Sequence, residues 1–352
     1  MGEEDAQADE NVHVIQKDAS GHVAEQNVKY GCTNSLFNGD FTQFALSMAH
    51  SAEEFARHVW LRGWQVVQFA QLPAWLKDND FLIRGHRPAL NSYWGCFKSV
   101  FRIHTETGNI WTHLLGCVLF AAIFAYFMIE APKSIQWQDK LVFSAFFTGA
   151  VLCLGFSCLF HTLCCHSVKV ARFANKLDYA GIAILTIGSF IPFLYYTFYC
   201  GKWQMIFYTA LICVLGLAAI LVSMIDKFAT PRFRTLRAGV FIGLGLSGVI
   251  PAMHYTIVAG WESAVNDASL GWLILMAAFY IGGALLYAFR IPERLVPGCF
   301  DLWFQSHQIF HVFVVVAALV HYYGISRLAD FRLTRGDCSP EQPLFIDYAE
   351  EL

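Results

Sequence analysis

Seven apolar stretches, each close to the ~20 residues that a helix needs to cross the hydrocarbon core, constrain the fold of this chain most. They lie near residues 111–129, 141–160, 179–199, 203–225, 238–259, 270–289 and 306–325. A composition of 56% hydrophobic and 14% charged residues over 352 positions is too apolar for a soluble protein. Because lipid favours segments that satisfy their own backbone hydrogen bonds, we predict an all-α membrane protein with a seven-transmembrane helix bundle over residues 111–325.

The segments outside the bundle differ in character. Residues 1–45 are polar, start with acidic residues and show no apolar period, which predicts a disordered tail. Residues 46–110 lead into the bundle and include an amphipathic helix from about Ser51, which forms a capping-box pattern with Glu54. That helix would either pack on the domain or lie in the membrane interface. Residues 326–352 form a C-terminal tail.

Basic residues predict the orientation of the bundle. The loops after the second, fourth and sixth stretches carry nine basic residues, and the opposite loops carry three. The nine are Lys169, Arg172, Lys176, Lys227, Arg232, Arg234, Arg237, Arg290 and Arg294, and the three are Lys133, Lys140 and Lys202. Because basic residues are enriched in cytoplasmic loops, we predict a cytoplasmic N-terminus and an extracellular C-terminus, inverted relative to G-protein-coupled receptors. The net charge of −3, with no basic stripe, indicates no nucleic-acid partner.

Small residues and cysteines add two expectations. Gly239 and Gly243 form a GxxxG pattern, which is typical of close helix contact. The 11 cysteines include no CxxC pair, which favours free thiols over a disulfide framework. Cys200 and Cys338 are the pair that could meet outside the cell.

Polar residues at the ends of apolar stretches predict a metal site. His307 and His311 lie one helical turn apart at the start of the last stretch, His161 ends the second stretch and Asp178 precedes the third. The predicted orientation brings all four to the cytoplasmic side. Three imidazoles with a fourth position left for water are typical of catalytic zinc, and nitrogen ligands suit zinc better than calcium or magnesium. We therefore predict an intracellular Zn²⁺ site with His161, His307 and His311 as ligands.

Two further side chains are candidate catalytic groups. Asp178 could be a fourth ligand, but we favour a role beside the metal-bound water, where a carboxylate can take a proton and pass it to a leaving group. Ser157 lies four residues before His161, on the same helical face. It could orient a ligand or donate to a substrate carbonyl, or it could bond back to its own helix.

Other histidines are more typical of ordinary packing. A single histidine in a membrane helix is usually a helix–helix hydrogen bonder, which is our interpretation of His113, His254 and His321. His166 with the adjacent Cys164 and Cys165 is a competing metal-binding group, but it lies in a basic loop and we expect it to be solvated.

Longer motifs resemble a known family. The stretches FRIHTETGNIWTHLLG from Phe101, LFHTLCCHS from Leu159, KLDYAGIAIL from Lys176, FATPRFRTLRAGVFIGLGLSG from Phe228 and FDLWFQSHQIFHV from Phe300 resemble the adiponectin receptors of the progestin and adipoQ receptor family. The resemblance runs from about Gly85 to Phe331, which is most of the chain.

This resemblance implies a plasma-membrane receptor that regulates lipid and glucose metabolism. It implies seven helices with the N-terminus inside, zinc on His161, His307 and His311, Asp178 near the zinc-bound water, and Ser157 in a Ser-x-x-x-His pattern shared with alkaline ceramidases. It also implies zinc-dependent ceramidase activity, with ceramide or fatty acid in the bundle. Implied partners are an adiponectin-like extracellular protein, a cytoplasmic adaptor at the N-terminal region and membrane lipid.

The residues leave three functions to compare. The first is a zinc-dependent lipid amidase, and the second is a protein-ligand receptor in which zinc is purely structural. The third is a transporter with a proton-relay histidine, which is less attractive because the polar residues cluster at one face.

Overall fold

A computed structural model describes residues 11–17, 23–29, 66–130, 135–226, 231–266, 268–335 and 338. The chain separates into two units, residues 1–48 and 49–352. In the first unit, β1 (Asn11–Lys17) pairs antiparallel with β2 (Val23–Lys29), and Val12 lies opposite Val28. β-Branched residues favour such paired strands, so this hairpin differs from the disorder predicted for residues 1–45. The helix predicted from Ser51 lies outside the described residues.

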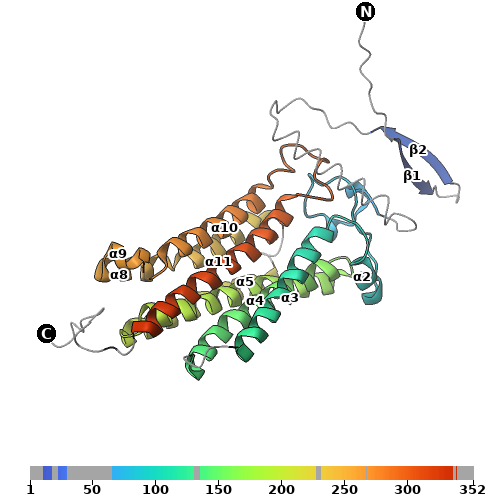
Figure 1. The fold of residues 1–352 in the computed structure, drawn as a ribbon. Coiled ribbons are helices and arrows are strands. Elements are labelled where there is room, and N and C mark those ends of the chain that lie inside the picture. The colour runs from blue at the N-terminus through green and yellow to red at the C-terminus, as the bar shows by residue number, and fades with distance from the viewer. Residues whose placement is uncertain are drawn as a thin grey trace, which may run out of the picture. The chain divides into compact units, whose positions relative to one another are not determined.

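The second unit is helical (Figure 1). Seven helical segments of its described residues are long and apolar enough to cross a membrane, as the sequence predicted. These segments are α3 (Thr107–Glu130), α4 (Trp137–Leu163), α5 (Val168–Thr197), α6 (Lys202–Met224), α7 with α8 (Arg234–Leu246 and Val249–Ala259), α10 (Leu270–Phe289) and α11 (Ser306–Arg335). The shorter elements are α2 (Tyr93–Ser99), α9 (Trp261–Asn266) and the 3-10 turns η1 (Phe69–Gln71), η2 (Ala74–Leu76) and η4 (Pro231–Phe233).

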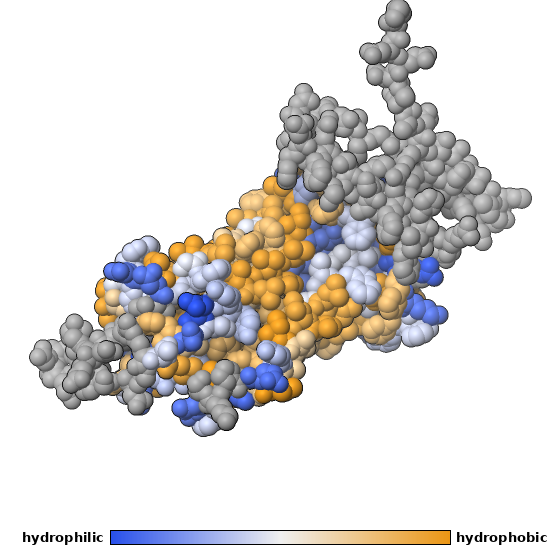
Figure 2. Space-filling model, in the orientation of Figure 1, coloured by the Kyte–Doolittle hydropathy of each residue, from blue (hydrophilic) through white to orange (hydrophobic). Residues whose placement is uncertain are grey.

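The outer surface of the helices is apolar, as a lipid-facing surface requires. Figure 2 shows hydrophobic side chains along the helices and hydrophilic ones mostly toward their ends. Large side chains such as Tyr126, Trp203 and Ile257 are exposed on the helices. A soluble protein rarely exposes a continuous apolar surface of this kind. The protein is therefore a multi-pass membrane protein.

Two helices extend beyond the stretches that hydropathy predicted. α5 begins at Val168 instead of about residue 179, so Lys169, Arg172 and Lys176 lie on its first turns and not in a loop. α11 continues to Arg335, into the predicted C-terminal tail. Each has 30 residues, or about 45 Å at 1.5 Å per residue, which exceeds the ~30 Å hydrocarbon core. Hydropathy detects only the part of a helix that lies in lipid.

The core is tightest between α4 and α5. A Cβ added at Gly181 of α5 would lie 2.8 Å from the Cα of Cys153 on α4, and one added at Gly188 would lie 2.5 Å from the carbonyl oxygen of Ala145. The two backbones are in direct contact because these positions lack side chains. Beside this contact, the buried rings of Phe143, Phe146 and Phe147 fill the space between helices.

The predicted GxxxG contact is wrong for the described residues. A Cβ on Gly239 or Gly243 of α7 would meet nothing within 4 Å in this part of the chain, because both glycines face outward. Gly248, at the break between α7 and α8, is the nearby glycine that packs closely, with a Cβ position 2.9 Å from the ring of Phe190. The pattern therefore does not mark a contact within the bundle.

Residues 66–106, which we call the lead-in segment, pack against one end of the bundle. Arg234 at the start of α7 bonds Asp78, and the Gln305 amide just before α11 donates to the carbonyl of Thr105 at 2.7 Å. We call this end of the bundle the lead-in end. It holds the starts of α3, α5, α7 and α11 and the ends of α4, α6 and α10. All predicted cytoplasmic loops lie at this end.

A disulfide joins two segments at the opposite end of the bundle. Cys200, after α5, bonds Cys338, after α11. The sequence had favoured free thiols, and Cys96, Cys117, Cys153, Cys158, Cys164, Cys165 and Cys213 are indeed free among the described residues. The topology had identified Cys200 and Cys338 as the pair that could meet outside the cell, and the structure has this disulfide although 138 residues separate the two.

Candidate metal centre

Three histidines meet at the lead-in end. His161 lies near the C-terminus of α4, and His307 and His311 lie in the first two turns of α11. One ring nitrogen from each lies within 4.8 Å of the others, and this is the group found among the described residues with the spacing of a metal site. His161 and His311 are buried and His307 is half-buried. The sequence-predicted ligands thus come together in the fold.

The hydrogen bonds of these rings leave nitrogen atoms free for an ion. His161 Nδ1 lies 2.7 Å from Glu106 Oε2, and His311 Nδ1 lies 3.1 Å from the carbonyl oxygen of Asn109. Both oxygens can only accept, so each Nδ1 carries the proton and each Nε2 keeps its lone pair. His161 Nε2 is buried without a hydrogen-bond partner among the described residues. An unpartnered buried nitrogen is costly, and these residues fit a divalent ion such as zinc, which would satisfy it.

A buried arginine holds the end of α4 in place. Arg87 of the lead-in segment donates to Ser99 Oγ at 2.8 Å, to the carbonyl of Thr162 at 3.0 Å and to the carbonyl of His161. The last carbonyls of a helix lack partners within the helix, and a cation stabilises them. The same charge acts on Glu106. Burial opposes ionisation of this acid, but its bond to His161 and the charge of Arg87 hold the pKa of Glu106 below its usual range.

A buried carboxylate holds the start of α11. Glu293 is 0% exposed and accepts hydrogen bonds from the backbone NH of Ser306 at 2.7 Å, from the Ser306 hydroxyl and from Asn79 Nδ2 at 3.0 Å. An acid at a helix N-terminus binds free NH groups and complements the helix dipole. His307 is the next residue of α11, so this cap fixes the turn that carries two of the three histidines.

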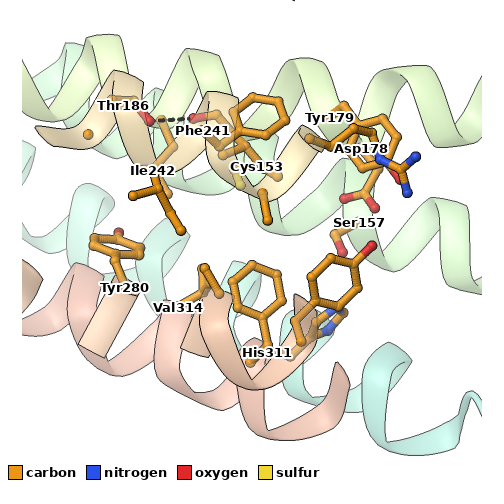
Figure 3. Close-up of a pocket in the computed structure, with 18 of the residues that line it drawn as sticks. Cys153, Ser157, Asp178, Tyr179, Thr186, Phe241, Ile242, Tyr280, His311 and Val314 are labelled. Carbon is orange, nitrogen blue, oxygen red and sulfur yellow. Dashed lines mark hydrogen bonds between the residues drawn. The ribbon is translucent and has the colours of Figure 1, made fainter. Parts of the chain in front are cut away.

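Asp178 and Ser157 lie beside the histidines (Figure 3). Asp178 lies well inside α5, not before its first turn as the sequence predicted, because α5 begins at Val168. Its carboxylate faces the Ser157 hydroxyl of α4. Asp178 is not part of the group with metal-ligand spacing. The position fits the predicted role beside the metal better than a role as fourth ligand.

The histidines open onto one large cavity. It has a volume of about 1000 Å³, at the upper end of the usual range for ligand pockets, and both Ser157 and Asp178 line it. Figure 3 shows Cys153, Phe241, Ile242, Tyr280 and Val314 along its walls. The cavity extends away from the lead-in end as far as Thr256, Trp261 and Leu270. Polar groups at one end and apolar walls beyond suit a ligand with a polar head and a long apolar chain.

Cationic and phenolic groups surround the histidine end of this cavity. Arg237 of α7 lies over the ring of Tyr179, with its guanidinium carbon 4.9 Å from the ring centroid, and Arg234 lies over Tyr287 at 5.3 Å. Both arginines are buried. Arg237 lines the cavity, and its charge favours oxygen atoms of a bound head group at this end, whereas Arg234 pairs with Asp78.

The histidines that we interpreted as packing residues lie outside the metal-ligand group. His254 Nδ1 bonds Tyr208 of α6 at 2.9 Å, and His321 Nε2 bonds the carbonyl of Ser189 on α5 at 3.0 Å. His113 instead stacks on His311, with ring centroids 3.6 Å apart. The competing group did not prove solvated throughout, since Cys165 is 1% exposed and His166 stacks against Tyr93. Packing of α2 against the end of α4 buries this turn.

Sequence reasoning missed the residues that support the site. Arg87, Glu106 and Glu293 all touch a histidine or the turn next to one. Glu106 offered the same signal as Asp178, an acid directly before a long apolar stretch. Arg87 and Glu293 lie in loops, where nothing in the sequence distinguishes them from solvated charges.

Comparison with known proteins identifies the family of this chain. Residues 101–322 match the haemolysin-III-related family. The chain is 56% identical over 306 residues to the "Adiponectin receptor protein" of Drosophila melanogaster, covering 87% of this chain and 69% of that protein. It is 57% identical over 270 residues to "Progestin and adipoQ receptor-like protein 1" of Caenorhabditis elegans, covering 77% of this chain and 62% of that protein, which is less than two thirds. A plant relative, "Heptahelical transmembrane protein 1" of Arabidopsis thaliana, is 37% identical over 277 residues, or 76% of this chain and 82% of that protein. The chain therefore belongs to the haemolysin-III-related family and, within it, to the adiponectin receptors of the progestin and adipoQ receptor family.

Proposed function

We propose that this protein is a receptor of the adiponectin-receptor type whose bundle hydrolyses a lipid amide, ceramide, at a zinc ion. The observation that carries the hydrolase is the buried group of three histidines that opens, beside a carboxylate, onto an apolar cavity of about 1000 Å³. His161, His307 and His311 would hold the ion. A bound zinc ion supplies Lewis acidity for the amide carbonyl and lowers the pKa of water.

The residues around the ion would handle binding and protons. Hydrolysis forms a bond between the carbonyl carbon and a water oxygen, and it breaks the carbon–nitrogen bond. Asp178, which lines the cavity beside the histidines, would accept the proton of that water and return it to the leaving amine, which departs as sphingosine. Ser157, whose hydroxyl faces this carboxylate, would orient it. The apolar walls hold the acyl chain, whose carboxylate is freed at the end that carries Arg237.

The receptor part of the proposal rests on the relatives and on orientation. The relatives named above include an adiponectin receptor, and we propose an adiponectin-like extracellular protein as ligand, a cytoplasmic adaptor at the N-terminal region and the plasma membrane as location. The excess of basic residues at the lead-in end supports a cytoplasmic position for that end. The Cys200–Cys338 disulfide at the other end supports an extracellular position there, because disulfides persist in oxidising compartments.

Metal analysis combined with turnover tests the hydrolase. Purified protein should contain one zinc ion per chain and release sphingosine from ceramide. His307→Ala should lose both zinc and turnover, whereas Asp178→Asn should keep zinc and lose turnover. His254→Ala is the matched control, since His254 lies in the bundle and bonds Tyr208 away from the cluster. Sphingosine release that survives chelation and both site variants contradicts the hydrolase.

A purely structural zinc is the second candidate. An ion on His161 and His307 would bind α4 to α11. In that case His307→Ala would lower the thermal stability, while the folded fraction would bind its protein ligand normally. Zinc-loaded protein without ceramide turnover would favour this candidate.

A further inference from the structure

Among the described residues, Glu106 makes the shortest hydrogen bond to an imidazole ring of the candidate ligands. It directly precedes α3, and its Oε2 atom lies 2.7 Å from His161 Nδ1. The same oxygen accepts a hydrogen bond from Asn109 Nδ2 at 2.8 Å. Two hydrogen bonds therefore fix Glu106. It contacts Nδ1 of His161, and Nε2 of the same ring is buried without a hydrogen-bond partner among the described residues.

The first turns of α3 contribute no histidine to the group but touch two of its members. Glu106, directly before α3, bonds His161. The carbonyl of Asn109 accepts a hydrogen bond from His311 Nδ1, and the ring of His113 stacks on the ring of His311 with an interplanar angle of 11°. These contacts fix the tautomer and the plane of two rings. A third helix thus arranges ligands that α4 and α11 supply.

Charge gives Glu106 a role that the carbonyl of Asn109 cannot fill. Three neutral imidazoles around a divalent ion leave its full charge uncompensated in a buried site, which is unfavourable. Glu106 places one negative charge a single ring away from His161 Nε2. A carboxylate on the outer nitrogen also makes an imidazole a stronger electron donor toward a metal.

We propose that Glu106 is a positioning residue that sets the metal affinity of the three-histidine group through His161. It orients the His161 ring, keeps Nδ1 protonated and strengthens Nε2 as a ligand. This inference rests on the zinc site of the proposed function but not on ceramide hydrolysis. Supporting partners of this kind typically change metal affinity by about 10- to 100-fold.

Zinc affinity of the purified full chain tests the role. Chelator competition should show about 10-fold weaker zinc binding by Glu106→Gln, which keeps an acceptor oxygen but loses the charge, and up to about 100-fold weaker binding by Glu106→Ala. Glu262→Gln, which removes an exposed acid on α9, should match the wild type. The absorption spectrum of bound Co²⁺ should shift in Glu106→Gln, because the donor strength of one ligand changes.

Thermal melts separate positioning from a merely structural role. Without metal, Glu106→Gln should melt with the wild type, whereas the stabilisation by added zinc should fall by about 1.4 kcal/mol for a tenfold loss of affinity. Equal zinc affinity in the wild type and both Glu106 variants overturns the proposal, and so does a Glu106→Gln variant already destabilised without metal. A wild type that binds zinc without releasing sphingosine removes the hydrolase alone, and one that binds no zinc overturns both proposals.

Discussion

The close contact between α4 and α5 predicts how a substitution at Gly181 changes stability and activity. Gly181→Ala adds a methyl group whose carbon would lie 2.8 Å from the Cα of Cys153 on α4. An ordinary contact needs at least 3.4 Å, so the helices must separate by roughly 0.6 Å or more at this level. The obstacle is backbone and cannot rotate away. Overpacking of this kind costs about 1–3 kcal/mol.

The displaced helix carries Asp178 but none of the three histidines. Gly181 lies three residues after Asp178, and Cys153 lies four residues before Ser157, so the separation acts directly on this pair. We expect Gly181→Ala to keep zinc, because His161, His307 and His311 lie on α4 and α11. Ceramide turnover should fall by up to about 100-fold, the loss that a misplacement of about 1 Å can cause.

Gly243→Ala is the matched control. It makes the same change in a membrane helix, but its Cβ would meet nothing within 4 Å among the described residues. The intrinsic gain of Ala over Gly in a helix, about 1 kcal/mol, applies to both variants and cancels in the comparison. Gly181→Ala should therefore melt about 2–12 °C below Gly243→Ala in the same detergent. Wild-type turnover and an unchanged melting temperature in Gly181→Ala would refute the argument that this contact positions Asp178.

Three further predictions follow from the supports of the site and from the disulfide. Glu293→Ala removes the cap of α11 and should cost about 2 kcal/mol of stability and weaken zinc binding in competition assays, whereas Glu262→Ala should do neither. Arg87→Met keeps the apolar part of the side chain but removes the donor for the last carbonyl groups of α4. The free energy of unfolding, measured by thermal unfolding, should therefore fall by about 2–3 kcal/mol. In Cys200→Ser, a membrane-impermeant maleimide should label Cys338 on intact cells, whereas labelling only after permeabilisation would reverse the proposed orientation.

Much of the fold could be predicted from the sequence because the bilayer imposes a simple rule on length and hydropathy. Seven membrane-spanning helices follow from that rule. The rule does not extend to helix parts outside lipid, so the early start of α5 was missed, and with it the true setting of Asp178. Nor does it say which face of a helix points inward, and for that reason Gly239 and Gly243 were assigned a contact that they do not make.

The histidines of the site could be predicted because a polar side chain at the edge of an apolar stretch has an unfavourable free energy in the membrane unless something compensates it. The residues that hold the histidines in place could not be predicted. Partners such as Glu293 and Ser306 come together only when a loop folds against a helix end. Asn79 and Glu293 are separated by 214 positions, and no local pattern relates them.

The 214 positions between Asn79 and Glu293 have a consequence for the order in which the parts of the site are synthesised. Asn79 is synthesised before the first membrane span, and Glu293 and the α11 histidines are synthesised after the sixth. His161 reaches the membrane early, but its two fellow ligands arrive only with the last helix. Until then, His161 at the end of α4 is the one histidine of the group that has been made. The proposed metal could therefore be fully bound only after the whole bundle has been inserted, and a nascent or truncated chain that lacks α11 would lack two of the three candidate ligands.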